Sequence, residues 1–189
     1  MSETRRPDDT AADLADLLAR TPPHLFAVAD GAVHDDLPDS LAQVGLASRP
    51  LYTGAMERAG PHLVALADRP AIDALLAVLG DRPMAVFWSW PGAGPAADHA
   101  EAIFVHLRRL GRIEVPKPFA DESGEEVEPV VFRHADPAAL MKVLPVLDET
   151  QREAFMGAAR GLVLIAHDRA GRGRIVRMPR DGRILLGAG

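Results

Sequence analysis

The chain has 189 residues, 48% hydrophobic and 25% charged, a globular composition that excludes a disordered chain, a collagen-like chain and a coiled coil. Acidic residues outnumber basic ones 27 to 21, and this net charge of −6 argues against a nucleic-acid-binding protein, whose affinity comes mainly from neutralised phosphates. Cysteine is absent, which excludes disulfides and thiolate zinc sites. No stretch approaches the ~20 apolar residues of a membrane span, so we expect a cytoplasmic protein with no membrane contact.

The hydrophobic pattern predicts elements along the whole chain. In chain order they are a helix at 11–19 capped by Thr10, a strand at 24–30, a helix at 34–44, strands at 47–52 and 62–66, a helix at 71–79, a strand at 84–90 and a helix at 96–110. Next come strands at 112–117 and 128–133, which flank an acidic loop as a hairpin, helices at 137–144 and 148–159, and strands at 162–167, 174–178 and 184–186.

The order of these elements predicts an α/β fold. Because strands and helices alternate in the first half, we expect a partly parallel sheet covered by helices, and the later hairpins make the sheet mixed. The chain is expected to form one two-lobed domain. Residues 1–9 are predicted to be a flexible N-terminus, 10–160 the α/β domain, and 161–189 an Arg-rich antiparallel meander packed on the same domain.

Charge is unevenly distributed along the chain. Residues 151–189 carry eight arginines and three acidic residues, a balance of +5, whereas the rest of the chain has a balance of −11. Such an asymmetry is typical of a binding face. Arg172, Arg174 and Arg177 are therefore candidate contacts for an acidic partner, and the alternative is a solvated hairpin with no partner.

Two His–Asp pairs are candidate catalytic residues. His34 and Asp35 are adjacent at a predicted helix start, and His134 lies two residues before Asp136. Metal-dependent hydrolysis needs further ligands that converge on one point, and we find no such set. A small metal- or nucleotide-dependent hydrolase that uses either pair is therefore kept only as an alternative.

The segment around the second pair also has a structural interpretation. Asp136 followed by Pro137 is the pattern of a helix N-cap and its first turn. Arg133, at the end of a predicted strand, then pairs with a nearby carboxylate, either Asp136 or Asp30. We favour this interpretation and expect no catalytic residue, no metal and no cofactor.

Several short motifs occur in an order that resembles a known family. They are a strand ending at Asp30 within 25–32, Leu-Tyr-x-Gly at 51–54, Pro-x-Leu-Val-x-Leu at 61–66, His-Leu-Arg at 106–108 and Phe-Arg-x-x-Asp-Pro at 132–137. Together they resemble the bacterial effector chaperones, or adaptors, of type VI secretion, a family catalogued as a domain of unknown function. The resemblance extends from about residue 25 to residue 155.

This resemblance implies a non-enzymatic protein that binds a specific secreted effector and helps to load it onto the VgrG spike. It implies no cofactor, and it makes Asp30, Tyr52, Gly54, Arg133, Asp136 and Pro137 framework or interface residues. The expected partners are the effector and the spike, with no nucleic acid. An immunity-type protein that binds and blocks a toxin is a further alternative.

Overall fold

The computed structural model describes residues 7–21, 24–34, 36–80, 84–116, 127–167, 173–181 and 183–186. The helices are α1 (Pro7–Ala19), α2 (Leu37–Gln43), α3 (Met56–Ala59), α4 (Arg69–Leu79), α5 (Ala97–Leu110), α6 (Pro137–Val143) and α7 (Glu149–Met156), and the 3-10 turn η1 (Leu144–Val146) joins the last two. The strands are β1 (His24–Asp30), β2 (Ser48–Pro50), β3 (Pro61–Leu66), β4 (Ala85–Trp90), β5 (Arg112–Pro116), β6 (Val127–Val131), β7 (Gly161–His167), β8 (Gly173–Pro179) and β9 (Leu185–Leu186).

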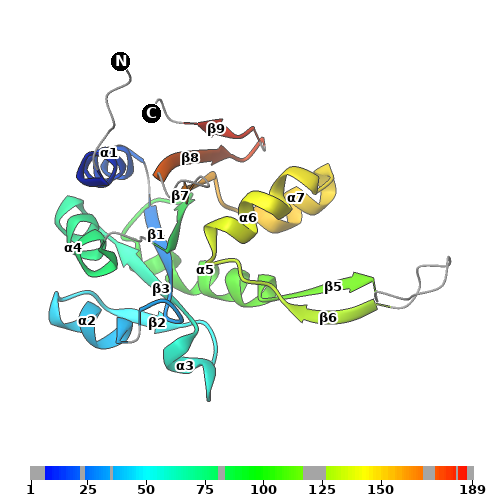
Figure 1. Ribbon diagram of the computed structural model, residues 1–189, viewed down its shortest axis with the longest axis horizontal. Coiled ribbons are helices and arrows are strands. Elements are labelled where there is room, and N and C mark those ends of the chain that lie inside the picture. The colour runs from blue at the N-terminus through cyan, green and yellow to red at the C-terminus, as the bar shows by residue number, and fades with distance from the viewer. Residues whose placement is uncertain are drawn as a thin grey trace.

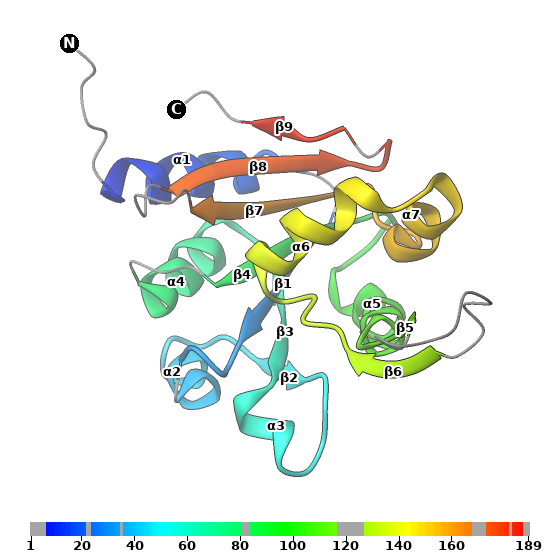
Figure 2. The same ribbon diagram turned by 45° about the vertical axis from the view of Figure 1, so that its right-hand side comes forward.

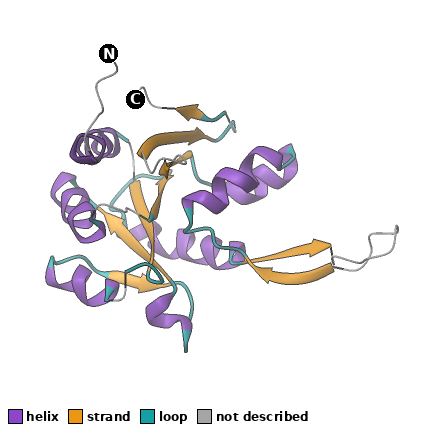
Figure 3. Ribbon diagram, in the orientation of Figure 1, coloured by secondary structure: helices purple, strands orange, loops and turns teal. Residues whose placement is uncertain are grey.

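Seven of these strands form a central sheet in the order β2-β3-β1-β4-β7-β8-β9 (Figure 1). Helices cover both faces of the sheet, as Figure 3 shows. This confirms the predicted α/β fold class and the C-terminal antiparallel meander. Among the described residues, no helix is long and apolar enough to cross a membrane.

The sheet separates two apolar cores, because successive side chains of a strand point to opposite faces. In β4 all six residues are buried; Trp88 and Trp90 face one core, whereas Phe87 faces the other. The first core is closed by α5, α6 and α7, and the second by α1, α2 and α4. The two tryptophans are therefore core residues, as their alternation with Phe87 and Ser89 suggests.

The prediction of a partly parallel sheet is wrong, because each strand pair in the described part of the chain is antiparallel. The alternation of strand and helix does produce a crossover, in which α4 connects β3 to β4. However, β1 lies between those two strands and pairs with both. The crossover therefore yields two strands of the same direction that are not neighbours.

The N-terminal helix is longer than predicted. α1 begins at Pro7, so Thr10 is not its N-cap, and the helix includes Pro7, Asp8 and Asp9 of the segment predicted as the N-terminus. Residues 1–6 of the predicted flexible terminus lie outside the described part. Leu14 and Leu18 of α1 are buried against the second core, which ties the helix to the sheet.

The predicted hairpin forms a separate two-stranded sheet. β5 and β6 pair in antiparallel register from Arg112↔Val131 to Pro116↔Val127. Figure 1 shows them extending away from the helices and the central sheet, and we call this hairpin the arm. The acidic loop predicted at 121–126 lies outside the described residues.

Candidate functional site

The residues of the family-like motifs meet where the arm leaves the body of the protein. Asp30 ends β1, and its side chain is only 7% exposed. One of its carboxylate oxygens lies 3.0 Å from the Arg133 guanidinium, a pair that joins residues 103 positions apart. Its other oxygen accepts a hydrogen bond from the Ala32 N–H at 3.0 Å. The pairing raises the pKa of Arg133, so this arginine keeps its charge.

Asp136 begins the helix that follows the arm. Its carboxylate accepts hydrogen bonds from the N–H groups of Ala138 at 2.8 Å and Ala139 at 3.3 Å, and Pro137 occupies the first turn of α6. The same carboxylate lies 4.0 Å from the Arg133 guanidinium. The predicted N-cap is therefore confirmed, and Arg133 pairs with both of the carboxylates proposed for it.

Tyr52 follows β2 and packs against glycines of two other segments. A methyl group at Gly111 would lie 2.1 Å from the Tyr52 hydroxyl oxygen, and one at Gly60 would lie 3.3 Å from the ring. Gly111 has a φ of −64°, so glycine is needed there for the contact and not for the backbone. Gly54 is the opposite case, because its φ of 71° favours glycine although the space around it is open.

Backbone hydrogen bonds connect these contacts at the base of the arm. The Phe132 N–H donates to the Gly111 C=O at 3.2 Å, and the Gly31 N–H donates to the Gly60 C=O at 3.0 Å. The resulting group, which we call the arm-base cluster, contains Asp30, Gly31, Tyr52, Gly60, Gly111, Phe132, Arg133 and Asp136. It links the ends of β1, α5 and β6 with the loop after β2 and the start of α6.

His134 lies beside this cluster but is not accessible to a substrate in this structure. It is 0% exposed, and its Nδ1 lies 3.2 Å from the Phe132 carbonyl oxygen. Burial lowers the pKa of His134 to about 4, so the ring is neutral at neutral pH. Within the described residues no hydrogen bond or ion pair joins His134 to Asp136, whose carboxylate is used as a helix cap.

The other predicted pair is only partly visible, because Asp35 lies outside the described residues. The Nε2 atom of His34 is buried and has no hydrogen-bond partner in the described part. Among the described residues, no group of three or more histidines and carboxylates is arranged to hold a metal ion. Within the described residues, no ligand set is therefore brought together around His34.

Arg174 and Arg177, two of the three predicted contact arginines, do not share one face of the sheet. Arg174 and Arg177 are both exposed on β8, whereas Arg172 lies outside the described residues. A spacing of three along a strand places two side chains on opposite faces. Arg174 lies on the same face of β8 as Val176 and Met178, which belong to the first core. Arg177 lies on the opposite face, on the side of α1. A flat partner surface therefore cannot contact both arginines.

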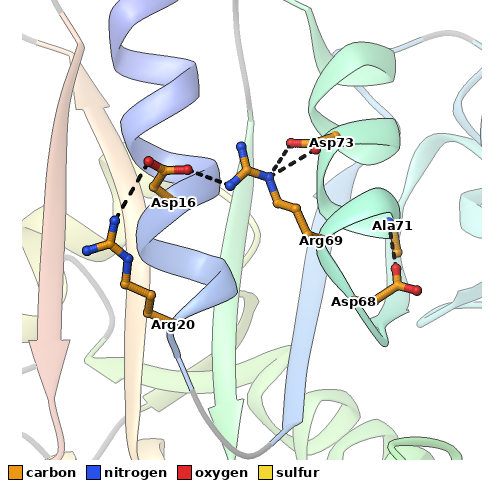
Figure 4. Close-up of polar contacts among 6 residues, drawn as sticks. All are labelled: Asp16, Arg20, Asp68, Arg69, Ala71 and Asp73. Carbon is orange, nitrogen blue, oxygen red and sulfur yellow. Dashed lines mark hydrogen bonds and ion pairs between the residues drawn. The ribbon is translucent and has the colours of Figure 1, made fainter.

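A second polar cluster joins α1 to α4 (Figure 4). Arg69 pairs with Asp16 at 2.5 Å and with Asp73 at 2.8 Å, and Arg20 lies 3.8 Å from Asp16. The hydrogen bond from Arg69 lowers the pKa of the Asp16 carboxyl. A pocket of about 240 Å³ lies next to this cluster. Because all these groups are substantially exposed and already paired, we assign them to the joining of the two helices.

Sequence reasoning missed the glycine contacts of the arm-base cluster. A methyl group at Gly31 would lie 2.4 Å from the Arg58 carbonyl oxygen, and the contact of Gly111 with Tyr52 joins residues that are far apart in the chain. The sequence pattern around Gly31 indicates only a turn, and the pattern around Gly111 indicates only the end of a helix. Their position inside or next to the family-like motifs was the available signal.

Comparison with known proteins gives one family. Residues 25–154 match the model described as "Domain of unknown function (DUF4123)". No curated protein and no solved structure matches the chain. The matched segment contains the whole arm-base cluster and spans most of the chain, and the protein therefore belongs to the DUF4123 family.

Proposed function

We propose that this protein is a non-enzymatic adaptor that binds a type VI secretion effector in the cytoplasm of the producing cell and helps to load it onto the VgrG spike. The DUF4123 family is associated with type VI secretion, which supports this proposal. The family-like motifs of the sequence point to the same role.

The observation that carries the proposal is the use of the motif residues as a framework. Arg133 forms ion pairs with Asp30 and Asp136, and Asp136 also caps α6. Tyr52 packs against Gly111. These contacts hold the base of an arm that extends from the body (Figure 1).

A projecting hairpin is physically suited to binding another protein. An isolated two-stranded hairpin is marginally stable in water, so it needs support at its base or along its length. The arm-base cluster supports the base of the arm, and a bound partner would support it along its length. Val131, at the body end of β6, is 65% exposed and offers apolar surface to such a partner.

The decisive experiment has two parts. The tagged protein is purified from producing cells with an active secretion apparatus, and the proteins that co-purify are identified by mass spectrometry. Secretion of the recovered effector is then compared between the parent, a deletion strain and a complemented strain. We expect one effector to co-purify, with or without the spike protein, and its secretion to fall in the deletion strain while its cellular amount stays measurable.

Two controls separate the alternative functions. An immunity protein would protect a cell that expresses the toxin without any secretion apparatus, whereas an adaptor is not required to do so. A hydrolase that depends on His134 would lose turnover in a His134→Phe variant, whereas the adaptor would keep its binding. Normal effector secretion in the deletion strain would refute the adaptor proposal.

A further inference from the structure

The two edges of the central sheet differ in how they are protected. The edge formed by β2 is three residues long and contains Pro50, which cannot donate a backbone hydrogen bond. Arg49 of this strand is held by Glu101 at 2.5 Å and lies 3.3 Å above the ring of Phe104. A proline and an anchored arginine are features that discourage the addition of another strand.

The opposite edge, β9, is also short, with two residues, but it contains neither a proline nor a charged side chain. It is the last strand of the sheet, with β8 on one side and no strand of the described residues on the other. Leu185 and Leu186 are 47% and 58% exposed. Figure 2 shows β9 at the rim of the sheet, beyond β8. Within the described residues no strand pairs with the outer side of β9, so an extended chain could be added there.

Both faces of this edge carry the same combination of side chains. Leu185 lies opposite Arg177 and Leu186 lies opposite Val176, so Leu185 and Arg177 share one face. Leu186 shares the other face with Arg174. Each face thus offers one exposed leucine and one exposed arginine. In the described part of the chain, no carboxylate lies within ion-pair distance of either arginine.

An added strand would match this arrangement. Its side chains would alternate between the two faces of the sheet. A segment in which two apolar residues are followed by two acidic residues would therefore place one apolar and one acidic side chain on each face. Strands in a sheet are about 4.8 Å apart, so a strand added beyond β9 would lie two such spacings from β8, toward which a long and flexible arginine side chain could extend. The separation of Arg174 and Arg177, which prevents joint contact with a flat surface, suits this geometry.

We propose that β9 is a docking edge for an extended, acidic segment of the partner protein, which joins the sheet as an additional strand. In this mode the backbone hydrogen bonds supply affinity, whereas the flanking side chains supply selectivity. The proposal deepens the proposed adaptor function by naming the surface and the kind of segment that it would bind.

The first test uses a defined probe, a short synthetic peptide in which pairs of valines alternate with pairs of glutamates. Binding to the full chain is measured at low salt together with amide hydrogen exchange. We expect saturable binding below about 1 mM and slower exchange at residues 184–186, with no change at the β2 edge, residues 48–50. A matched peptide with lysines in place of the glutamates should bind at least about tenfold more weakly.

Substitutions at the edge complete the test. Leu185→Lys with Leu186→Lys should weaken peptide binding about tenfold, because lysine on an edge opposes strand addition. Arg174→Glu with Arg177→Glu should reverse the preference between the two peptides. Val146→Lys is the control, because Val146 is 77% exposed in η1, outside the sheet.

Three results would overturn the proposal: no saturable binding, binding that ignores the leucine substitutions, or protection elsewhere than β9. A dimer of the chain that dissociates in the double lysine variant would also overturn it, by assigning the edge to a second copy. The peptide measurement needs no secreted effector. It therefore tests the docking edge independently of the adaptor function. A normal peptide result with normal effector secretion in the deletion strain would refute only the adaptor function.

Discussion

Acidification from neutral pH to pH 4 should destabilise the protein through His134. The ring is fully buried, and burial lowers its pKa from 6.5 to about 4. The charge of His106 acts in the same direction, whereas the Phe132 carbonyl and Asp30 act in the opposite one. Because the unfolded chain binds the proton more readily, this contribution to stability is complete above pH 6.5. It is lost as the pH falls toward 4.

The size of the effect follows from the difference between the two pKa values. One pKa unit corresponds to about 1.4 kcal/mol, so the loss attributable to His134 is about 3 kcal/mol. Burial also lowers the pKa values of His62 and His106, so wild-type stability should decline further in the same direction. A comparison with a variant that cannot titrate at residue 134 isolates the single contribution.

The assay is urea unfolding across this pH range for the wild type and for His134→Phe. Phenylalanine keeps a ring in the buried site, and the Phe132 carbonyl still accepts the backbone N–H of residue 134 at 2.9 Å. Between neutral pH and pH 4, the unfolding free energy of the variant should fall by about 3 kcal/mol less than that of the wild type. Val146→Ala, at an exposed position in η1 that does not titrate, should retain the wild-type slope. Parallel curves for the wild type and His134→Phe would refute the reasoning.

Three further predictions concern the arm-base cluster and the adjoining turn, all measured by urea unfolding at neutral pH. Gly54→Ala should reduce the unfolding free energy by about 1 kcal/mol because of its positive φ, and an unchanged value would contradict this. Gly111→Ala should cost about 2 kcal/mol through its collision with the Tyr52 hydroxyl, and Tyr52→Phe should recover part of that loss; a double variant without recovery would disprove the contact. Asp30→Asn and Arg133→Ala should show a coupling of about 1 kcal/mol in a double-mutant cycle, and strict additivity would be the contrary result.

The elements were largely predictable because their signals are local. Asp136 followed by Pro137 specifies the start of α6 through a hydrogen bond two residues away and a fixed φ, and the structure has both. The opposite faces of Arg174 and Arg177 were also contained in their spacing of three on a predicted strand. By contrast, the pairing of Arg133 with a carboxylate could only be narrowed to Asp30 and Asp136.

The order of strands was not predictable from the same signals. Helix–strand alternation indicates a crossover, but it does not say whether another strand lies between the two that are connected. Here β1 lies between β3 and β4, which turns an expected parallel pair into two antiparallel ones. The contact of Tyr52 with Gly111 has the same origin, because it depends on where the loop after β2 meets the end of α5.

The segment that matches the family, residues 25–154, is shorter than the central sheet requires, because three strands of that sheet lie after residue 154. β7 lies outside residues 25–154, yet it pairs with β4, whose six residues are all buried. Without β7 the apolar strand β4 would become an unprotected edge, so the sheet needs the C-terminal strands to be complete. The arm-base cluster lies within the family segment, whereas β9 lies outside it. Under the proposed adaptor function, a framework inside the family segment and a docking edge outside it would allow related proteins to share one scaffold and still select different partners.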